Sequence, residues 1–413
     1  MRAVFVNYVH PDVPHVSAMR VRCFADVLAQ KGHQIVLLTR TLNDTEASKP
    51  AEQVASELLS HDWSRPYHLA CAPLPDPRLQ ALRRGGLLRP VRMAIIAWHY
   101  LFRTGVFSDW AEGSRPYWQV LAELFRPEVT WGTFGNTDTL AVARGIARLA
   151  GAPWAMDVKD SWDPFIPWLL RGILAKRFGD AAVITVNSLF QAERSRRWFS
   201  QEPSIIYSGV PAHLIELPLN FPQEDGFRIT LIGSAYNGEN LEVFVSGLRV
   251  WLSGLRPPER SKVTFSYAGA DVKAVERACT DLANLCRIEL HTYLELDKLM
   301  RLCMASNVNC YLWSPRGFHH KLIELFCCRR PIISFPGEYA EAFVLAKETR
   351  GDFNCCKTEN ELVCCFGLLW SKRGKPQVIG DTSALCRFSW DAQGDRLLKL
   401  MRTIVGDRPF IRS

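Results

Sequence analysis

Short apolar segments alternate with amphipathic ones along most of this 413-residue chain, in two successive series. In the first series the pattern predicts strands over 1–9, 34–40, 128–134, 153–160, 181–188 and 203–211, and helices over 17–32, 137–151 and 189–199. In the second it predicts strands over 227–236, 262–270, 286–294, 308–314 and 330–335, and helices over 240–255, 296–306 and 319–328. Strands that alternate with helices form parallel sheets, so the predicted fold class is α/β with two doubly wound domains facing a cleft.

The domain boundary is predicted where this alternation stops. A chain of this length is too long for a single core. Residues 212–226 contain prolines and a glycine and have little periodicity, so we expect a linker there. The two domains would then cover 1–211 and 227–388, and 389–413 would contain one more amphipathic helix.

Charge and cysteine content narrow the class of protein. The formal charge of +8 and the pI near 8.9 favour an anionic partner. Thirteen cysteines without any Cys-x-x-Cys spacing argue against structural zinc, and the start of the chain has no secretory signal. We therefore expect reduced thiols, a cytoplasmic location and no membrane span, which needs about 20 consecutive apolar residues.

Several phrases, taken in order, resemble the motifs of GT-B glycosyltransferases. The phrases are SAMRVRCFADVLAQKGHQIVLLT (17–39), PWAMDVKDSW (153–162), GDAAVITVNSLFQAE with IIYSGVP (179–211), ITLIGSAYNGENLEVFV (229–245), FHHKLIELFCCRRPIISF (318–335) and FSWDAQGDRLLKLM (388–401). Among these enzymes the chain most resembles the retaining family-four glycosyltransferases, which build bacterial surface polysaccharides. The resemblance covers the chain except residues 45–110, and it implies Rossmann-like domains and a final helix that returns to the first one.

The resemblance implies a nucleotide-sugar donor, UDP-type rather than GDP-type, bound by the second domain. Lys321 would lie beside the diphosphate, and Glu324 would accept hydrogen bonds from the ribose hydroxyls. The full set of donor-binding candidates is Gly233, Ser234, Arg316, Gly317, Phe318, Lys321 and Glu324. The alternative for Lys321 and Glu324 is an ion pair on a solvated helix surface.

Two departures from the family pattern concern this donor site. Arg316 stands where relatives have a glutamate that holds the donor sugar, and a guanidinium cannot accept hydrogen bonds. The loop after residue 232 lacks the arginine and lysine that clamp the diphosphate in relatives. Backbone N–H groups of Gly233 and Ser234 would then contribute, and Arg316 could meet an acidic sugar or a phosphate.

The acceptor side is expected in the first domain. Asp160, and after it Asp157, would orient or deprotonate an acceptor hydroxyl, although either could simply cap a helix. Ser17 and Arg20 follow the first strand and could approach the ligands. No Asp-x-Asp phrase is present to hold a divalent ion, so we expect metal-independent chemistry and no cofactor.

Residues 77–103 carry six arginines and no acid. Helical spacing from residue 87 places Leu87, Val91, Ile95, Trp98 and Phe102 on one face and Arg89, Arg92, His99 and Arg103 on the other. A basic amphipathic helix of this kind suits an anionic membrane surface, here with Arg83, Arg84, Arg89, Arg92 and Trp98 as contact residues. The alternative is a core helix with one solvated face.

The sequence therefore predicts a peripheral enzyme on the inner face of the membrane, which transfers a sugar to a lipid-linked or glycan acceptor. Three other functions stay open. The chain could be a scaffold of the same fold without donor chemistry, which Arg316 favours, or a nucleotide-sugar epimerase. A nucleic-acid binder is suggested only by charge and lacks a binding module, so no nucleic-acid partner is predicted.

Overall fold

The computed structural model describes residues 1–43, 46–218, 226–235, 237–315, 317–373 and 379–406. The chain forms two compact units. Unit 1 consists of Met1–Gly209 together with the segment that begins at Trp390, and unit 2 consists of Val210–Ser389. Each unit is built around one parallel sheet and is described separately.

The sheet of unit 1 has seven strands in the order β3-β2-β1-β4-β5-β6-β7. The strands are β1 (Arg2–Val6), β2 (Gln34–Arg40), β3 (Tyr67–Cys71), β4 (Val129–Thr133), β5 (Trp154–Asp157), β6 (Val183–Val186) and β7 (Ser204–Ile205). All neighbouring pairs run parallel. The order of the first six strands is that of a Rossmann domain.

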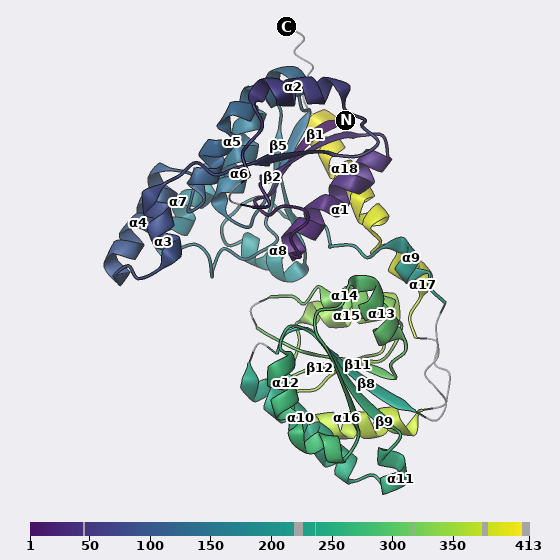
Figure 1. Cartoon of the computed structure of the whole chain (residues 1–413). Coiled ribbons are helices and arrows are strands. Elements are labelled where there is room, and N and C mark those ends of the chain that lie inside the picture. Colours follow the sequence, from purple (N-terminus) through teal and green to yellow (C-terminus); the bar gives the residue numbers. More distant parts are fainter. Residues whose placement is uncertain (44–45, 219–225, 236, 316, 374–378, 407–413) are drawn as a thin grey trace. The chain divides into compact units, whose positions relative to one another are not determined.

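Alternate residues of the central strand β1 pack against helices on opposite faces of this sheet. Ala3 and Phe5 belong to the core beneath α1 (Val16–Gln30) and α18 (Trp390–Gly406), whereas Val4 and Val6 face α5 (Ser108–Val120) and α6 (Thr137–Leu149). Figure 1 shows these two layers of helices. Because both faces are covered, the central strands are largely apolar, and the sequence shows apolar runs rather than strict alternation of apolar and polar residues.

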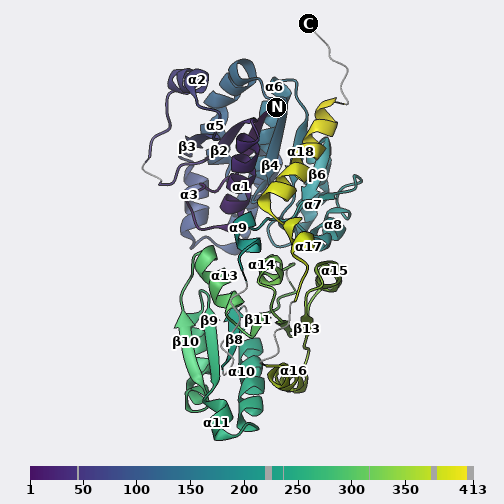
Figure 2. The same ribbon diagram turned by 90° about the vertical axis from the view of Figure 1, so that its right-hand side faces the viewer.

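The C-terminal helix α18 packs directly on α1 (Figure 2). Gly394 allows this close approach, since a Cβ there would lie 2.7 Å from Val27 Cγ1. The side-chain oxygen of Gln393 accepts a hydrogen bond from the backbone N–H of Tyr207 at 2.9 Å. These contacts make α18 part of the core of unit 1.

Three further helices of unit 1 lie within residues 45–110, the stretch without a family phrase: α2 (Ala51–Ser60), α3 (Pro77–Arg84) and α4 (Arg89–Phe102). Later in the chain the unit also contains α7 (Trp168–Phe178) and α8 (Leu189–Ser195). The amphipathic helix predicted from residue 87 corresponds to α4, whereas the separate helix α3 before it was not predicted. Gly85 and Gly86, with φ of 78° and 81°, separate α3 from α4 because few other residues adopt this backbone conformation.

The sheet of unit 2 has six parallel strands in the order β10-β9-β8-β11-β12-β13. The strands are β8 (Phe227–Ile232), β9 (Val263–Ala268), β10 (Arg287–His291), β11 (Val308–Leu312), β12 (Ile332–Phe335) and β13 (Phe353–Cys355). Counted from β8, this is again the Rossmann order. The predicted fold class, α/β with two Rossmann-like domains, is therefore confirmed.

Two layers of helices cover the sheet of unit 2 (Figure 1). The main core lies beneath α10 (Gly238–Ser253), α12 (Val272–Ala278) and α16 (Glu359–Ser371). The other layer contains α13 (Leu296–Met304), α14 (Lys321–Cys327) and α15 (Ala340–Thr349). Three short helices complete the unit: α9 (Ala212–Ile215), α11 (Pro257–Arg260) and α17 (Thr382–Cys386). Helix α9 lies in the segment predicted as a linker, of which residues 219–225 are outside the described part.

Candidate functional site

The topology of unit 2 creates a point where ligands commonly bind in doubly wound sheets. Strands β8 and β11 are neighbours at the position where the strand order reverses, and ligands bind at the carboxyl ends of such strands. Strand β8 ends at Ile232 and continues into Gly233 and Ser234, while the segment after β11 leads to α14. These two connections carry the described donor-binding candidates.

Lys321 and Gly233 lie against each other at this point. Gly233 has a φ of 92°, and a Cβ built on it would lie 3.1 Å from the Nζ atom of Lys321. The sequence therefore needs glycine here both for the backbone conformation and to leave room for the ammonium group. This contact places the ammonium group of Lys321 at the end of β8. The loop that follows β8 has no lysine or arginine of its own.

The backbone of Gly233 is fixed by the neighbouring strand. Its N–H donates to the carbonyl of Ala268 at 2.9 Å, and its carbonyl accepts from the hydroxyl of Tyr267 at 2.7 Å. The expectation that the Gly233 amide is available to a phosphate is thus corrected. Ser234 is half-buried, and within the described residues neither its amide nor its hydroxyl forms a hydrogen bond.

Glu324 lies one turn after Lys321 on α14, and residues three apart share a helix face. The helix is held by its buried side chains, which are Leu322, Ile323, Leu325, Phe326 and Cys327. Glu324 itself is half-buried, and its burial raises the pKa of the carboxyl, while the charge of Lys321 acts in the opposite direction. Among the described residues this carboxylate has no ion pair or hydrogen bond, so its oxygens can accept from a ligand.

The remaining donor-side candidates differ in position. Arg316 lies outside the described residues. Gly317 is half-buried, and Phe318 is buried with its ring 5.5 Å from that of His320, so Phe318 supports the loop from inside. His319 accepts a hydrogen bond from the Ser314 amide at 3.0 Å, and burial lowers its pKa to about 4, which keeps the imidazole neutral. No role was predicted for His319, which ties the loop to the end of β11.

Asp160 lies after β5 in unit 1 and is the accessible acid among the acceptor-side candidates. Its carboxylate is half-exposed and forms an ion pair with Lys159, whose side chain is nearly buried. The pKa of His15 is lowered by burial and by the charge of Lys159, and Asp160 acts on it in the opposite direction. Lys159, Asp160 and His15 therefore share one neighbourhood at the carboxyl edge of the sheet.

Asp157 and Arg20, two other acceptor-side candidates, form a fully buried ion pair instead. Arg20 Nε and Nη2 donate to the two carboxylate oxygens of Asp157 at 3.1 and 2.9 Å, and neither side chain is exposed. Thr185 donates a third hydrogen bond, at 2.8 Å. This geometry corrects the prediction of a reactive Asp157 and of an Arg20 that reaches a ligand, because both are committed to the core.

Ser17 is also buried. Its hydroxyl donates to the side-chain oxygen of Asn7 at 2.8 Å, and its amide donates to His15 Nδ1 at 3.1 Å, which caps α1. Ser17 thus holds the first loop in place and does not approach a ligand directly. This corrects its assignment as an acceptor contact.

No group of three or more His, Cys, Asp or Glu side chains in the described part of the chain is placed to hold a metal ion. No helix in the same part is long and apolar enough to cross a membrane. All thirteen cysteines are free thiols.

The predicted apolar stripe of α4 faces outward. Val91 and Phe102 are exposed, and Leu87, Ile95 and Trp98 are half-buried. The polar face needs correction: His99 is buried and bonded to the Ser108 hydroxyl at 2.9 Å, and Ile96 packs against the core. Helix α4 is therefore anchored by part of the face that was predicted to be solvated.

Two of the predicted membrane contacts have partners inside the unit. Arg83 is bound through two guanidinium nitrogens to Asp109, at 2.6 and 2.8 Å, so its charge is compensated. The ring of Trp98 lies between the guanidinium groups of Arg78 and Arg103, 4.9 and 5.5 Å from its centroid. Arg84, Arg89 and Arg92 are exposed, and the described residues offer them no ion pair.

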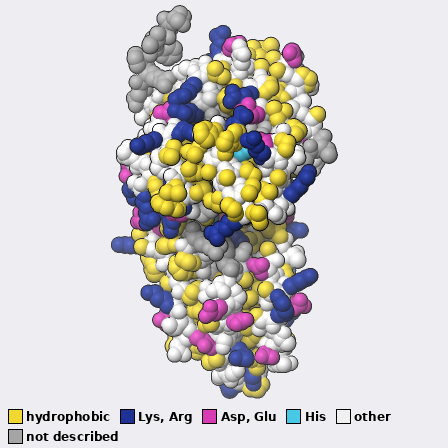
Figure 3. Space-filling model, turned by 90° about the vertical axis from the view of Figure 1, so that its left-hand side faces the viewer, with side chains coloured by type: hydrophobic (Ala, Val, Ile, Leu, Met, Phe, Trp, Pro, Cys, Tyr) yellow, Lys and Arg dark blue, Asp and Glu magenta, His cyan; other side chains and the backbone are white. Residues whose placement is uncertain are grey.

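Helix α7 adds apolar surface that sequence reasoning missed. Phe165, Trp168, Leu169 and Ile173 are exposed, Trp168 to 72%. Helices α4 and α7 are in contact, and the Tyr100 hydroxyl donates to the Phe165 carbonyl at 3.3 Å. We call this area the α4–α7 surface; its exposed apolar residues are Leu88, Val91, Met93, Phe102, Phe165, Trp168, Leu169 and Ile173. Figure 3 shows hydrophobic side chains gathered on this side of unit 1, with lysine and arginine side chains around them.

Comparison with known proteins identifies the fold. No protein-family model and no curated protein matches the sequence significantly. Solved structures do match: sucrose-phosphate synthase from Thermosynechococcus elongatus superposes with a TM-score of 0.65 at 14% identity, over 98% of this chain and 99% of the other. The lipopolysaccharide outer core galactosyltransferase WaaB gives 0.59 at 11%, over 98% and 99%. HepE from Anabaena, solved with UDP and glucose, gives 0.56 at 13%, over 98% of both chains.

These similarities extend over both units. The chain therefore has the GT-B fold, as the sequence resemblance predicted. At these identities the comparison establishes the fold, and the chemistry has to be argued from the residues of this chain.

Proposed function

We propose that this protein is a glycosyltransferase that uses a nucleotide-diphosphate sugar as donor, UDP-type rather than GDP-type. The observation that carries the proposal is the contact of Lys321 with Gly233 at the carboxyl edge of β8, with Glu324 one turn further on α14. A cation beside a glycine-containing loop suits a diphosphate, and a carboxylate without a protein partner suits vicinal hydroxyls. HepE, which shares the fold, was solved with UDP and with UDP-glucose.

Each residue has a distinct part in this proposal. The Lys321 ammonium would neutralise charge that develops on the leaving diphosphate. The amide and hydroxyl of Ser234 would donate to phosphate oxygens, and the Glu324 carboxylate would accept from the ribose. Because the leaving group is stabilised by a lysine, we propose chemistry without a metal ion, and the family resemblance favours retention.

Asp160 is the residue proposed to act on the acceptor hydroxyl. It is half-exposed at the carboxyl edge of the sheet of unit 1, and Lys159 holds its carboxylate in place. A carboxylate held at this position can accept the proton of an acceptor hydroxyl. The buried pair of Arg20 and Asp157 would keep the underlying strand end rigid.

The acceptor is proposed to be a lipid-linked or glycan molecule of surface polysaccharide synthesis, met at the inner face of the membrane. The α4–α7 surface supports this placement, because exposed aromatic and aliphatic side chains lie beside the uncompensated charges of Arg84, Arg89 and Arg92. An enzyme that docks in this way would encounter a lipid-anchored substrate by diffusion along the membrane surface.

The test is turnover of donor. Purified protein is incubated with a panel of UDP-sugars, and released UDP and the sugar products are measured, since transferases slowly hydrolyse their donors. The proposal predicts UDP release from at least one donor. Release should be at least about 10-fold slower in Glu324→Ala, because this variant loses one charge-assisted hydrogen bond. Conversion to an isomeric UDP-sugar without UDP release would identify an epimerase instead. Absence of both activities, with no UDP binding, would identify a scaffold.

A further inference from the structure

A cavity in unit 1 is lined by a concentration of positive charge that the proposed reaction does not use. Its volume is about 250 Å³, and it is formed by the end of α4, the middle of α6 and the end of α7. The lining residues are Arg103, Thr104, Ala141, Arg144, Gly145, Arg148, Arg177 and Phe178, which include four arginines and no acid. The cavity is smaller than a typical pocket for a drug-sized ligand, of about 300–1,000 Å³, so it suits a small group.

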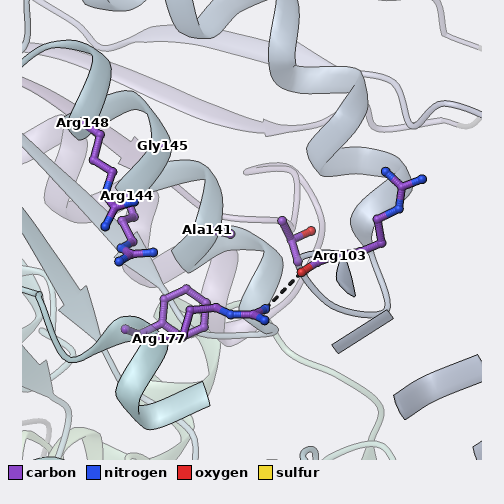
Figure 4. A pocket seen from close by; sticks show the side chains of 8 residues that line it. Arg103, Ala141, Arg144, Gly145, Arg148 and Arg177 are labelled. Carbon is purple, nitrogen blue, oxygen red and sulfur yellow. Dashed lines mark hydrogen bonds between the residues drawn. The ribbon is translucent and has the colours of Figure 1, made fainter. Parts of the chain in front are cut away.

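The arginines are held in place by the fold. Arg177 donates to the carbonyls of Tyr100, Leu101 and Arg103 at 2.9, 2.6 and 3.1 Å, and so caps the last turn of α4. Arg144 and Arg148 lie one turn apart on α6 and share the carboxylate of Asp180. In Figure 4 Arg144, Arg148 and Arg177 line one side, while the Arg103 side chain points away from them.

The charge in this cavity is incompletely balanced. Asp180 is shared by two guanidinium groups, and within the described residues Arg177 contacts carbonyl oxygens and has no ion pair. Burial and the charge of Arg144 lower the pKa of Arg177, so the positive groups disfavour one another. An anion placed among them would relieve this repulsion, and guanidinium forks match the oxygens of a phosphate.

We propose that Arg144, Arg148 and Arg177 bind a phosphate group in this cavity, and that the phosphate belongs to an anionic phospholipid on which the α4–α7 surface rests. The second part rests on the proposed membrane docking. Helices α4 and α7 carry the exposed apolar residues, and the ends of these two helices line the cavity. The same chemistry would take a free phosphate compound, which the experiment distinguishes.

The experiment has a soluble arm and a membrane arm. The first titrates inorganic phosphate and sn-glycerol 3-phosphate into the full chain, followed by phosphorus NMR or calorimetry. The second measures flotation with vesicles of zwitterionic lipid containing phosphatidylglycerol. The test variant is Arg144→Gln with Arg148→Gln, and the control is Arg22→Gln with Arg196→Gln. The control removes two ion-paired arginines from other parts of unit 1, and both are more exposed than Arg144.

A phospholipid ligand predicts that the test variant loses at least about 10-fold in vesicle affinity, while the control changes by less than about 3-fold. If only the soluble arm separates the two variants, the ligand is a free phosphate compound and the cavity assignment still holds. If neither arm separates them, the cavity is not a phosphate site and the proposal is wrong.

Folding and function are tested separately from the cavity. Melting temperatures identify a test variant that fails to fold, in which case Arg148→Glu replaces it, since this side chain is largely exposed. UDP binding should be unchanged in every cavity variant. Loss of vesicle binding in Trp168→Ala with Leu169→Ala, but not in the cavity variant, would place the membrane contact on the apolar residues alone and overturn the phospholipid assignment.

Discussion

At the scale of single residues, Glu324 has a testable pH dependence. Burial raises the pKa of its carboxyl above the ordinary value, and only the ionised form accepts hydrogen bonds from both ribose hydroxyls. Nucleotide affinity should therefore fall as the pH is lowered through this raised pKa. Glu324→Ala should weaken UDP binding by about 1–3 kcal/mol at neutral pH, the value for hydrogen bonds to a charged group.

Calorimetry with UDP between pH 5 and 8 would measure both effects. Glu324→Gln serves as the matched control, because its amide cannot titrate and should flatten the pH profile. The stability of the folded state responds in the opposite direction. Because the pKa of this carboxyl is higher in the folded than in the unfolded state, its contribution to stability is lost as the pH rises from the unfolded-state pKa through the folded-state pKa. An unchanged profile in Glu324→Gln would assign the pH dependence to another group.

On the acceptor side we expect substitution of Asp160 to affect catalysis and substitution of the buried Asp157 to affect stability. Asp160→Asn should lower turnover far more than donor affinity, because the proposed carboxylate acts on the acceptor rather than on the donor. Steady-state kinetics and melting temperature would be compared with those of the wild type. A variant with unaltered rate and unaltered stability would leave Asp160 without a role.

Asp157→Asn should instead destabilise the protein by about 3–5 kcal/mol, because it leaves the buried guanidinium of Arg20 without its counter-charge. Urea denaturation measures this difference. The control is Asp395→Asn, which breaks a surface pair with Lys31 worth about 0–1 kcal/mol. Equal effects in both variants would mean that the buried pair is not the constraint we describe.

The same residues show what a sequence can and cannot predict about a site. Lys321 and Glu324 were proposed as a pair because both stand in one short phrase that resembles a family motif, and the structure places both on α14. The burial of Asp157 was missed because its partner is 137 positions away, and only the packed sheet brings them together. Gly233 was predicted as a ligand, but its amide is used by β9, a pairing that residue order alone does not reveal.

At the scale of elements, the α4–α7 surface determines the expected interaction with membranes. Arg84, Arg89 and Arg92 should each add about 1 kcal/mol of attraction to acidic lipid, partly screened at physiological salt where the Debye length is about 8 Å. Vesicle flotation should therefore be strong at low salt and weaker at high salt, yet not abolished, because the apolar contact persists.

Replacing these three arginines by glutamine should weaken vesicle binding and remove much of its salt dependence, because the apolar contact persists, while UDP affinity stays intact. The control replaces Arg249, Arg256 and Arg277, three exposed arginines of unit 2, and should have a smaller effect. Arg83 is left in place because it holds Asp109. A wild-type protein that does not associate with vesicles at any salt concentration would rule out membrane docking.

The pattern of α4 was predictable and that of α7 was not. In α4 the apolar residues recur with helical spacing, so their common face could be read from the sequence. In α7 apolar residues occur on all sides: Leu170 and Leu174 are buried, while Trp168, Leu169 and Ile173 are exposed. Without periodicity the sequence could not show that this helix carries an outward apolar face.

At the scale of the whole molecule, two Rossmann-like sheets with the same strand order follow from the alternation of apolar strands and helices. Residues 45–110 carry no family phrase, yet they supply α2, β3, α3 and α4 and complete the first sheet. The strand order that both sheets share places Lys321 at the point of the second sheet where this order reverses. We propose that a nucleotide diphosphate binds there.

Calorimetric titration of UDP into the wild type, Lys321→Met and Lys298→Met tests this claim most directly. Both substitutions remove an exposed lysine charge from unit 2, but Lys298 lies on α13 and has no place in the proposed site. We expect saturable UDP binding by the wild type. The affinity should fall by at least about 10-fold in Lys321→Met, because one charge-assisted contact is lost, and should stay within about 2-fold in Lys298→Met. No UDP binding by the wild type, or equal affinity in all three proteins, would contradict it.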